Sequence, residues 1–252
     1  MSKQEKKIEI LVVAHKPVEV AKNSLLKSIQ VGASLASKKL DTDYFDNTGD
    51  NISDLNRSYC ELTAIYWAWK NLDADYYGLF HYRRYLSFAI DQDEDPRAGR
   101  AYADLQTAEA KINLDEAYMR KLIQQNDLIV PRLDDTTNTT NDKSIYAQYE
   151  REHYIKDLDL CLSYMEEKYP EIAKFNDTLN DSKGYFCNMF IMNKELFNEY
   201  CTFMFDTLAY FDENTDISQY NVQQHRVDGF IAERLTNIFI HYVNSQADRK
   251  VK

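Results

Sequence analysis

The stretch Ile8–Ala14, IEILVVA, decides the fold, because it is short, predominantly apolar and rich in β-branched residues. Such a run predicts a strand that is buried on both faces of a parallel sheet. His15-Lys16-Pro17 ends the run, and the proline holds Lys16 in an extended conformation. Because ligands of open α/β sheets bind beyond the carboxyl ends of the strands, we expect His15 and Lys16 to lie at a ligand site.

Helices and strands alternate along the rest of the chain. The expected elements are a helix starting at the capping box Ser58–Glu61, a strand over Tyr76–Leu86, a strand at Asp127–Pro131, a helical region over Ile145–Tyr169, a strand over Tyr185–Met192, a helix capped by Asn193 and a last helix carrying Val227 to Ile238. This alternation predicts an α/β fold with a mostly parallel sheet flanked by helices. We expect one domain over residues 1–252, with polar insertions at 87–113 and 132–144 that form active-site lids or solvated loops.

Composition excludes several classes of protein. The 252 residues suit one compact domain, and 41 acidic against 30 basic residues give a net charge of −11, which argues against nucleic acid as a partner. The six glycines form neither G-x-G-x-x-G nor a Walker A loop, which excludes Rossmann dehydrogenases and P-loop ATPases. The four cysteines lack a C-x-x-C pair, and MSKQEKKIEI lacks the apolar segment of a signal peptide, so we expect a soluble cytoplasmic protein.

Two stretches predict a binding site for an anion such as a diphosphate. Asn47–Ser53 is a turn-rich loop that leads towards a helix N-terminus, whose free N–H groups favour an anion, so Asn51 and Ser53 are candidates. The exit of the strand carries a second group of candidates, His81, Tyr82, Arg83 and Arg84. Neighbouring side chains on a strand face opposite sides, so we expect at most one arginine to fork onto a given diphosphate. Surface salt bridges in an acidic protein are the alternative.

A series of sequence blocks follows in an order that is specific to one protein family. The blocks are D-N-T-G-D-N-I-S from Asp46, Y-C-E-L-T-A-I-Y-W-A-W-K-N from Tyr59, Y-G-L-F-H-Y-R-R-Y-L from Tyr77, N-D-L-I-V-P from Asn126, C-N-M-F-I-M from Cys187 and R-V-D-G-F-I-A-E-R-L from Arg226. Over nearly its whole length the chain resembles the DUF4422 family, bacterial proteins of capsule, exopolysaccharide and O-antigen gene clusters that are regarded as glycosyltransferases. The resemblance implies a GT-A-like fold and transfer of a hexose from a nucleotide sugar, with UDP-galactose, in pyranose or furanose form, among the donors.

The resemblance also implies a glycan or lipid-linked glycan acceptor, a cytoplasmic location and at most peripheral contact with the inner face of the bacterial membrane. Most GT-A enzymes end a central strand with D-x-D, which holds Mn²⁺ or Mg²⁺ on the donor diphosphate. Here the strand ends in His81-Tyr82-Arg83, and D-x-D spacings elsewhere, such as Asp41/Asp43, close no apolar strand. We therefore expect no metal cofactor, because cationic side chains replace it, with Asp43 or Asp46 as ligands if Mn²⁺ or Mg²⁺ is required.

The last predicted helix carries the candidates for a catalytic base. Arg226, Gly229 and Glu233 share one face of it, since residues seven apart lie two turns along, and the glycine leaves room for a ligand. Glu233 is therefore the first candidate to deprotonate an acceptor hydroxyl, and Asp228, on a different side of the helix, is the second. Arg226 is a candidate for binding the donor. A salt bridge of Glu233 with Arg234 or Arg226 is the alternative.

Two polar residues are candidates for the acceptor side. His153, in a polar helical region, acts on the acceptor or is merely exposed. Asn188, within an apolar strand, must find partners, because an unpaired buried amide costs about 1–3 kcal/mol, and it bonds either a sugar or a neighbouring loop. The capping box accounts for Glu61 without any ligand.

Two other functions remain open at this point. A carbohydrate- or nucleotide-binding protein without turnover would keep the cleft and would not need Glu233. A sugar nucleotidyltransferase is disfavoured, because the first strand runs into His15-Lys16-Pro17 rather than a glycine-rich phosphate loop.

Overall fold

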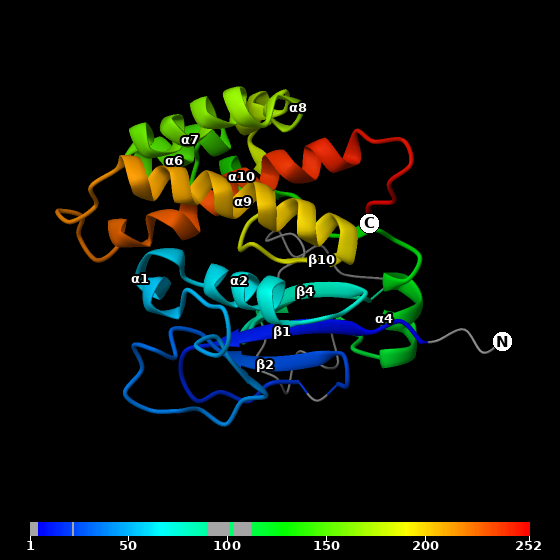
Figure 1. The fold of residues 1–252 in the computed structure, drawn as a ribbon. Helices are drawn as coiled ribbons and strands as arrows, with labels where there is room; N and C mark the ends of the chain where they lie inside the picture. Colours follow the sequence, from blue (N-terminus) through cyan, green and yellow to red (C-terminus); the bar gives the residue numbers. More distant parts are fainter. Residues whose placement is uncertain (1–4, 22, 90–100, 103–111) are drawn as a thin grey trace.

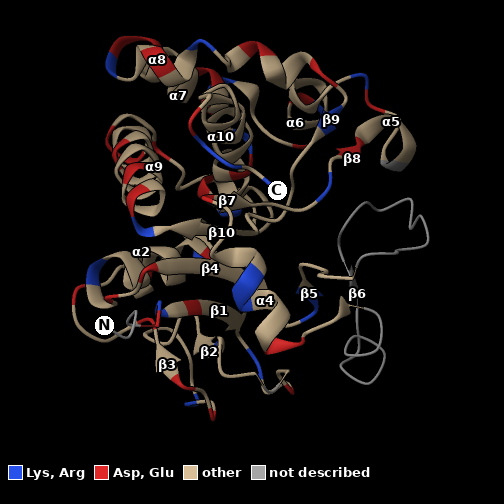
Figure 2. Cartoon of the chain, turned by 90° about the vertical axis from the view of Figure 1, so that its right-hand side faces the viewer, with Lys and Arg blue, Asp and Glu red and all other residues tan. Residues whose placement is uncertain are grey.

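The computed structural model describes residues 5–21, 23–89, 101–102 and 112–252. Its main sheet is built from β1 (Ile8–Ala14), β2 (Leu26–Gln30), β3 (Tyr44–Phe45), β4 (Tyr76–His81), β5 (Arg84–Tyr85), β6 (Ala101–Tyr102), β7 (Leu128–Ile129) and β10 (Phe190–Asn193). The strand order is β3–β2–β1–β4–β10–β7, seen from bottom to top in Figure 2, and β5 and β6 extend from β4. Strands β1 to β4 run parallel, whereas β10 runs antiparallel to both of its neighbours. The predicted α/β class with a mostly parallel sheet is confirmed.

The helices cover both faces of this sheet. They are α1 (Asn56–Tyr59), α2 (Leu62–Asn71), α4 (Glu116–Ile123), α5 (Thr136–Thr139), α6 (Ile145–Glu152), α7 (Ile155–Lys168), α8 (Pro170–Ala173), α9 (Lys194–Asn214) and α10 (Val227–Asn244), with 3-10 turns η1 (Ser53–Leu55), η2 (Asn176–Asn180) and η3 (Gln224–Arg226). Helices α2 and α9 lie on one side of the strands and α4 on the other (Figure 2). Helices α6 and α7 lie above α9 in Figure 1, and α10 crosses behind α9.

Strand β1 shows why the sequence requires two covering layers. All seven of its residues are buried. Leu11 and Val13 belong to the larger apolar cluster, which α2, α9 and α10 also supply, whereas Ile10 and Val12 belong to the smaller cluster on the side of α4. Alternation along a strand sends successive side chains to opposite faces, so an uninterrupted apolar run needs apolar partners on both.

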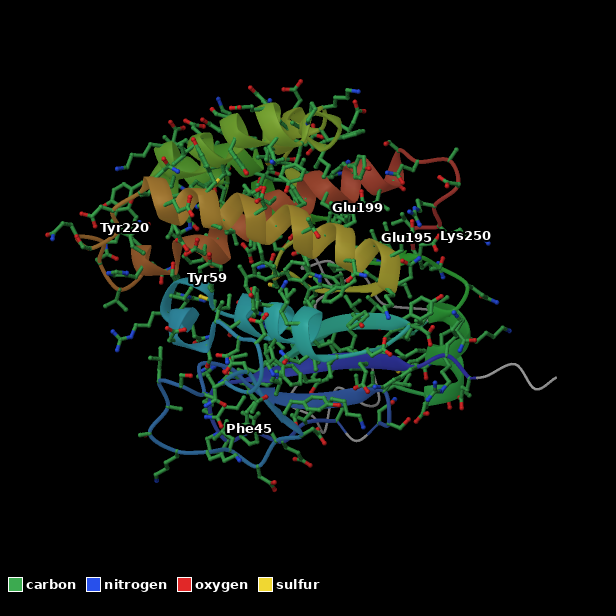
Figure 3. The ribbon with its side chains drawn as sticks, viewed as in Figure 1. Phe45, Tyr59, Glu195, Glu199, Tyr220 and Lys250 are labelled. Carbon is green, nitrogen blue, oxygen red and sulfur yellow. The ribbon has the colours of Figure 1, made fainter. Side chains whose placement is uncertain are left out.

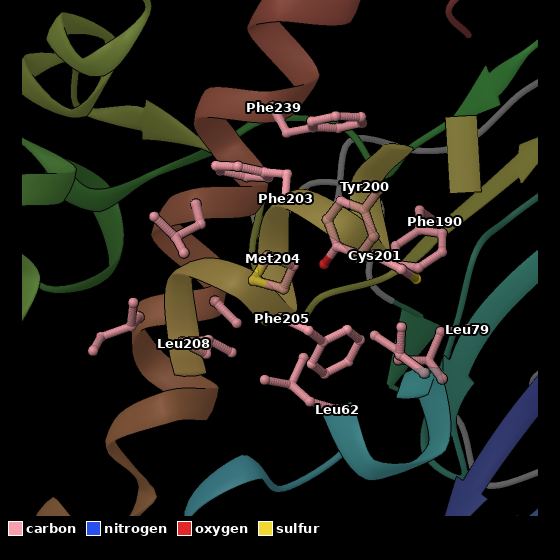
Figure 4. Packing of buried hydrophobic residues seen from close by; sticks show 14 of the residues in the cluster. Leu62, Leu79, Phe190, Tyr200, Cys201, Phe203, Met204, Phe205, Leu208 and Phe239 are labelled. Carbon is pink, nitrogen blue, oxygen red and sulfur yellow. The ribbon is translucent and has the colours of Figure 1, made fainter. Parts of the chain in front are cut away.

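The larger cluster is rich in aromatic rings, which accounts for much of the unusual aromatic content. Phe203 of α9 stacks on Phe239 of α10 with ring centroids 5.9 Å apart, and Tyr200 meets the same ring edge-on at 5.4 Å (Figure 4). The buried Tyr200 hydroxyl bonds Thr236 at 2.9 Å. These rings pack α9 against α10, the helix whose first turns carry the predicted catalytic face.

Three predicted elements differ from the observed ones because the chain turns within them. The expected helical region over Ile145–Tyr169 divides into α6 and α7 at His153, which has an extended backbone. The expected strand over Tyr76–Leu86 turns at Tyr82-Arg83, so that β5 folds back on β4. The expected strand over Tyr185–Met192 begins only at Phe190. None of these turns contains the glycine or proline that usually marks a turn in a sequence.

The two polar insertions have different outcomes. Segment 132–144 forms β8 (Asp134–Asp135) and α5, and β8 pairs with β9 (Lys183–Gly184) in a separate two-stranded sheet. Most of segment 87–113, namely 90–100 and 103–111, lies outside the described residues, so its role as a lid stays a prediction. No described helix combines the length and the apolarity that crossing a bilayer requires.

Candidate active site

A cleft of about 850 Å³ lies beyond the carboxyl ends of β1, β2 and β4. Its other walls come from α1, the start of α2, the turn before β10, η3 and the first turns of α10. The residues that line it are Val13, His15, Val31, Asn56, Arg57, Cys60, Glu61, His81, Tyr82, Arg83, Arg84, Cys187, Val222, His225, Arg226, Gly229, Phe230 and Glu233. This is the edge at which ligands of open α/β sheets bind, as the sequence predicts from His15.

The cleft is locally basic in a chain whose net charge is −11. Four arginines line it, against two glutamates, and they are Arg57, Arg83, Arg84 and Arg226. Burial, followed by the charges of Lys16, Arg83 and Arg226, lowers the pKa of His15 below its ordinary value. A concentration of cations in an acidic protein favours an anionic ligand at this place.

The predicted donor-binding residues of the two strand ends meet in this cleft. His15, His81, Tyr82, Arg83 and Arg84 all line it, and Lys16 lies beside it with its Nζ 5.6 Å from the Tyr82 ring centroid. The Arg83 guanidinium lies 4.9 Å from the same ring. The expectation that the two arginines face opposite sides is wrong, because the turn between β4 and β5 brings both into the cleft.

The structure places Asn51 and Ser53 outside the cleft. Ser53 is fully buried, and its hydroxyl donates to Oδ1 of Asp46 at 2.5 Å. The same carboxylate accepts the N–H groups of Gly32 and Ala33 at 2.7 and 2.9 Å, and Asn51 accepts the N–H of Ser53. The anion at this loop is therefore the chain's own Asp46, which accepts from the turn at Gly32-Ala33 and from the Ser53 and Thr63 hydroxyls.

A left-handed turn before β10 joins two sides of the cleft. Cys187 and Asn188 have φ values of +73° and +49°, which are uncommon for residues other than glycine. The backbone carbonyl of Cys187 bonds Nε2 of His81 at 2.7 Å, and its N–H donates to Oε1 of Glu233 at 2.8 Å. The turn thus fixes an imidazole from β4 relative to a carboxylate from α10. Strained backbone of this kind concentrates at functional sites.

The predicted face of the last helix is also confirmed, with one change. Arg226, Gly229 and Glu233 all line the cleft. A Cβ on Gly229 would lie 3.3 Å from both Cβ and Sγ of Cys60, so the glycine allows α1 to approach α10 rather than making room for a ligand. Oε2 of Glu233 accepts from Arg234 at 3.0 Å, so the predicted salt bridge exists together with the cleft position.

The expected capping box is wrong, and the error conceals a cleft residue. Ser58 lies within α1 and its hydroxyl donates to Asp228, while Glu61 directly precedes α2 and its side chain caps no N–H of that helix. The chain reverses at Cys60, whose φ is +51°. Glu61 consequently faces the cleft, where its Oε1 accepts the side-chain amide of Asn188 at 2.9 Å.

The other candidates lie behind the cleft wall. Asp228 is fully buried, and burial, followed by the charge of Asp212, raises its pKa to about 8. Asn188 is also buried, in the turn rather than in a strand. His153 is neither helical nor exposed, because its ring stacks on Phe230 at 4.1 Å between centroids, and burial lowers its pKa. Among these side chains, only Phe230 lines the cleft.

Sequence reasoning missed part of the cleft lining. It also leaves open whether the site requires a divalent metal. Arg57 and His225 belong to no quoted motif, and Cys60 was quoted within a sequence block without being a candidate; the proximity of η3 to α1 brings the three together. Within the described residues, no three His, Cys, Asp or Glu side chains are grouped to share an ion. Asp43 accepts from Ser28 instead. Metal independence stays a prediction.

Comparisons with known proteins identify the relatives of this fold. The model of a domain of unknown function, DUF4422, matches residues 9–245. Among solved structures, the WbbM bifunctional glycosyltransferase in its apo form matches with a TM-score of 0.87 and 33% sequence identity. The match covers 98% of this chain and 44% of that one, so the chain spans less than half of the relative. The comparison with curated proteins gives no match. The predicted glycosyltransferase-like fold is confirmed.

Proposed function

The chain belongs to the DUF4422 family, and we propose that it is a glycosyltransferase that moves a hexose from a UDP-sugar to a bacterial surface-polysaccharide acceptor. The observation that carries the proposal is the arginine-lined cleft at the carboxyl ends of the parallel strands of an acidic chain. The likeness to part of a bifunctional glycosyltransferase supports the reaction class. UDP-galactose, in pyranose or furanose form, is the donor to test first. We propose a cytoplasmic location, at the inner face of the membrane if the acceptor is lipid-linked.

The proposed donor diphosphate lies against Arg83, Arg84 and Arg226. A guanidinium forks onto two phosphate oxygens, and fixed cations stabilise negative charge that develops in a transition state. As the bond between the anomeric carbon and the diphosphate breaks, its electron pair leaves with UDP. The arginines balance that charge, which supports a reaction without a divalent metal.

The proposed base is Glu233. The acceptor hydroxyl oxygen forms the new bond to the anomeric carbon, and its proton passes to the carboxylate. The position of Glu233 in the cleft, across from the strand ends, supports this role. Asp228 stays the second candidate, although it is buried behind α1 and does not line the cleft.

Calorimetric titration tests the donor proposal directly. UDP, GDP, dTDP and CMP are titrated in turn, with EDTA and then with Mn²⁺. We expect UDP to bind most tightly and with the same affinity in both buffers. Loss of UDP binding in EDTA would overturn metal independence and direct attention to Asp43 and Asp46. Binding of UDP-sugar with neither transfer nor slow hydrolysis to UDP would favour a binding protein without turnover.

A further inference from the structure

The two carboxylates of the cleft differ in how many of their oxygens the protein already uses. Glu233 accepts the Cys187 N–H through Oε1 and Arg234 through Oε2, so both oxygens are engaged. Glu61 accepts the Asn188 amide through Oε1 only. Its Oε2 bonds no group in the part of the chain that the structure describes. Glu61 therefore offers the cleft an acceptor oxygen without a protein partner.

Glu61 is also held in a fixed orientation by Asn188. The Asn188 side chain is 2% exposed, donates to Glu61 at 2.9 Å and to the Gly229 carbonyl at 3.4 Å, and accepts from Thr236 at 3.1 Å. Both neighbours of its amide nitrogen are acceptors, so the amide cannot be reversed without losing these bonds. The left-handed backbone of Asn188, which asparagine tolerates better than most residues, aims the amide at Glu61. The carboxylate is thus organised before any ligand binds.

The chemistry of the cleft restricts what this oxygen binds. A phosphate is repelled by a carboxylate, and the arginines at the strand ends offer it a better position. Arg226, whose charge interacts with that of Glu61, donates its Nε to Sγ of Cys60 at 3.4 Å. A sugar hydroxyl is the remaining donor of a nucleotide sugar, and a hydroxyl bound to an ionised acceptor makes a short, strong hydrogen bond.

We infer that Glu61 accepts a hydrogen bond from a hydroxyl of the donor hexose and so selects the sugar, with Asn188 as its positioning residue. The inference rests on the proposed function, because it assumes a UDP-sugar in the cleft. A site built to bond a substrate hydroxyl rejects analogues that lack it, since its own polar group is then left unpaired. Glu61 thereby sets which hexoses bind, and the arginines hold the diphosphate common to all of them.

The test compares UDP with UDP-galactose by calorimetry in wild type, Glu61→Ala, Glu61→Gln and Asn188→Ala. We expect each variant to lose about tenfold or more in affinity for UDP-galactose, while UDP binds within about twofold of wild type. In Glu61→Gln the amide oxygen turns to Asn188, which leaves an N–H₂ group facing the cleft. Asn141→Ala is the matched control, because Asn141 also has a left-handed backbone, with φ of +61°, and does not line the cleft.

Deoxyfluoro analogues of the donor identify the hydroxyl. Replacing the bonded hydroxyl by fluorine should weaken binding to wild type and leave binding to Glu61→Ala unchanged, which is the coupling expected of two groups in contact. If folded Glu61→Ala keeps the full preference for UDP-galactose over UDP, the inference is overturned and the proposed function stands. The inference is also overturned if wild type itself binds UDP-galactose no more tightly than UDP. If wild type binds no nucleotide, the proposed function itself fails.

Discussion

Glu233→Gln separates a catalytic role from a structural one, because the structure predicts a distinct effect for each. Glu233 accepts the Cys187 N–H at 2.8 Å and the Arg234 guanidinium at 3.0 Å. Glutamine keeps one acceptor oxygen for the Cys187 N–H. It turns an N–H₂ group towards Arg234, whose side chain is only 2% exposed, and it cannot take a proton. We therefore expect one effect on folding and a separate effect on turnover.

The two effects differ in size. Losing a charge-assisted hydrogen bond costs about 1.5–3 kcal/mol of unfolding free energy. In a chain of this length each kcal/mol of lost unfolding free energy lowers Tm by about 2–4 °C, so the expected decrease in Tm is about 3–12 °C. Losing a general base lowers kcat by about 10²- to 10⁴-fold. At about 1.36 kcal/mol per tenfold, that corresponds to about 2.7–5.4 kcal/mol of activation free energy.

The assay measures UDP release per folded molecule, together with Tm and the calorimetric affinity for UDP. Glu195→Gln is the matched control, because Glu195 also accepts from an arginine, Arg249, at 2.8 Å and lies at the opposite end of the molecule from Tyr59 of α1 (Figure 3). Its side chain is 74% exposed, so the loss of its charge should lower Tm less than the Glu233 change does and should leave turnover unchanged. Unchanged turnover in folded Glu233→Gln would refute the base assignment. Turnover lost only in Asp228→Asn would transfer the role to Asp228.

Two further predictions concern the donor and the buried acid. Arg83→Ala and Arg84→Ala should each weaken UDP binding by about 10- to 150-fold, which is the effect of losing one charge-assisted hydrogen bond. Their Tm should stay close to that of the control Arg249→Ala. Wild-type affinity for UDP in both variants would assign the two arginines to the surface. Burial and Asp212 raise the pKa of Asp228 to about 8, so the folded state keeps a proton that the unfolded chain releases, and this lowers stability as pH rises from about 4 to 8. The Tm of Asp228→Asn should therefore rise relative to that of wild type as pH increases from about 4 to 8. If the two Tm profiles stay parallel over this range, the raised pKa of Asp228 is contradicted.

Periodicity was sufficient to predict the fold wherever an apolar run is uninterrupted. Strand β1 matches its predicted bounds, Ile8–Ala14, because its seven buried residues leave no alternative to a central strand. Its position at the centre of the sheet in turn predicts that His15 lines the cleft. Turns inside the predicted strands could not be predicted, since neither Tyr82-Arg83 nor Cys187-Asn188 contains the glycine or proline that usually marks a turn.

Prediction of the site was limited for the same reason. The cleft position of Gly229 was predicted from its spacing to Arg226 and Glu233, because Arg226 caps α10 and the other two residues lie in its first turns. Glu61 was explained by a capping box, and only the reversal at Cys60 shows that it faces the cleft. Helical spacing reports on residues of one helix, and it carries no information on which separate elements meet.

The left-handed residues of the cleft explain how a chain with only six glycines builds this site. Cys60, Cys187 and Asn188 adopt positive φ where a regular helix or strand was expected. Cys187 and Asn188 bring backbone and side-chain groups to both glutamates and to His81, and the reversal at Cys60 turns Glu61 towards the cleft. A glycine would reach the same conformation at lower cost but would supply no side chain. Asparagine at position 188 supplies both the turn and the amide that holds Glu61. The same residue therefore accounts for a local departure from the strand pattern and for the geometry of the proposed sugar contact.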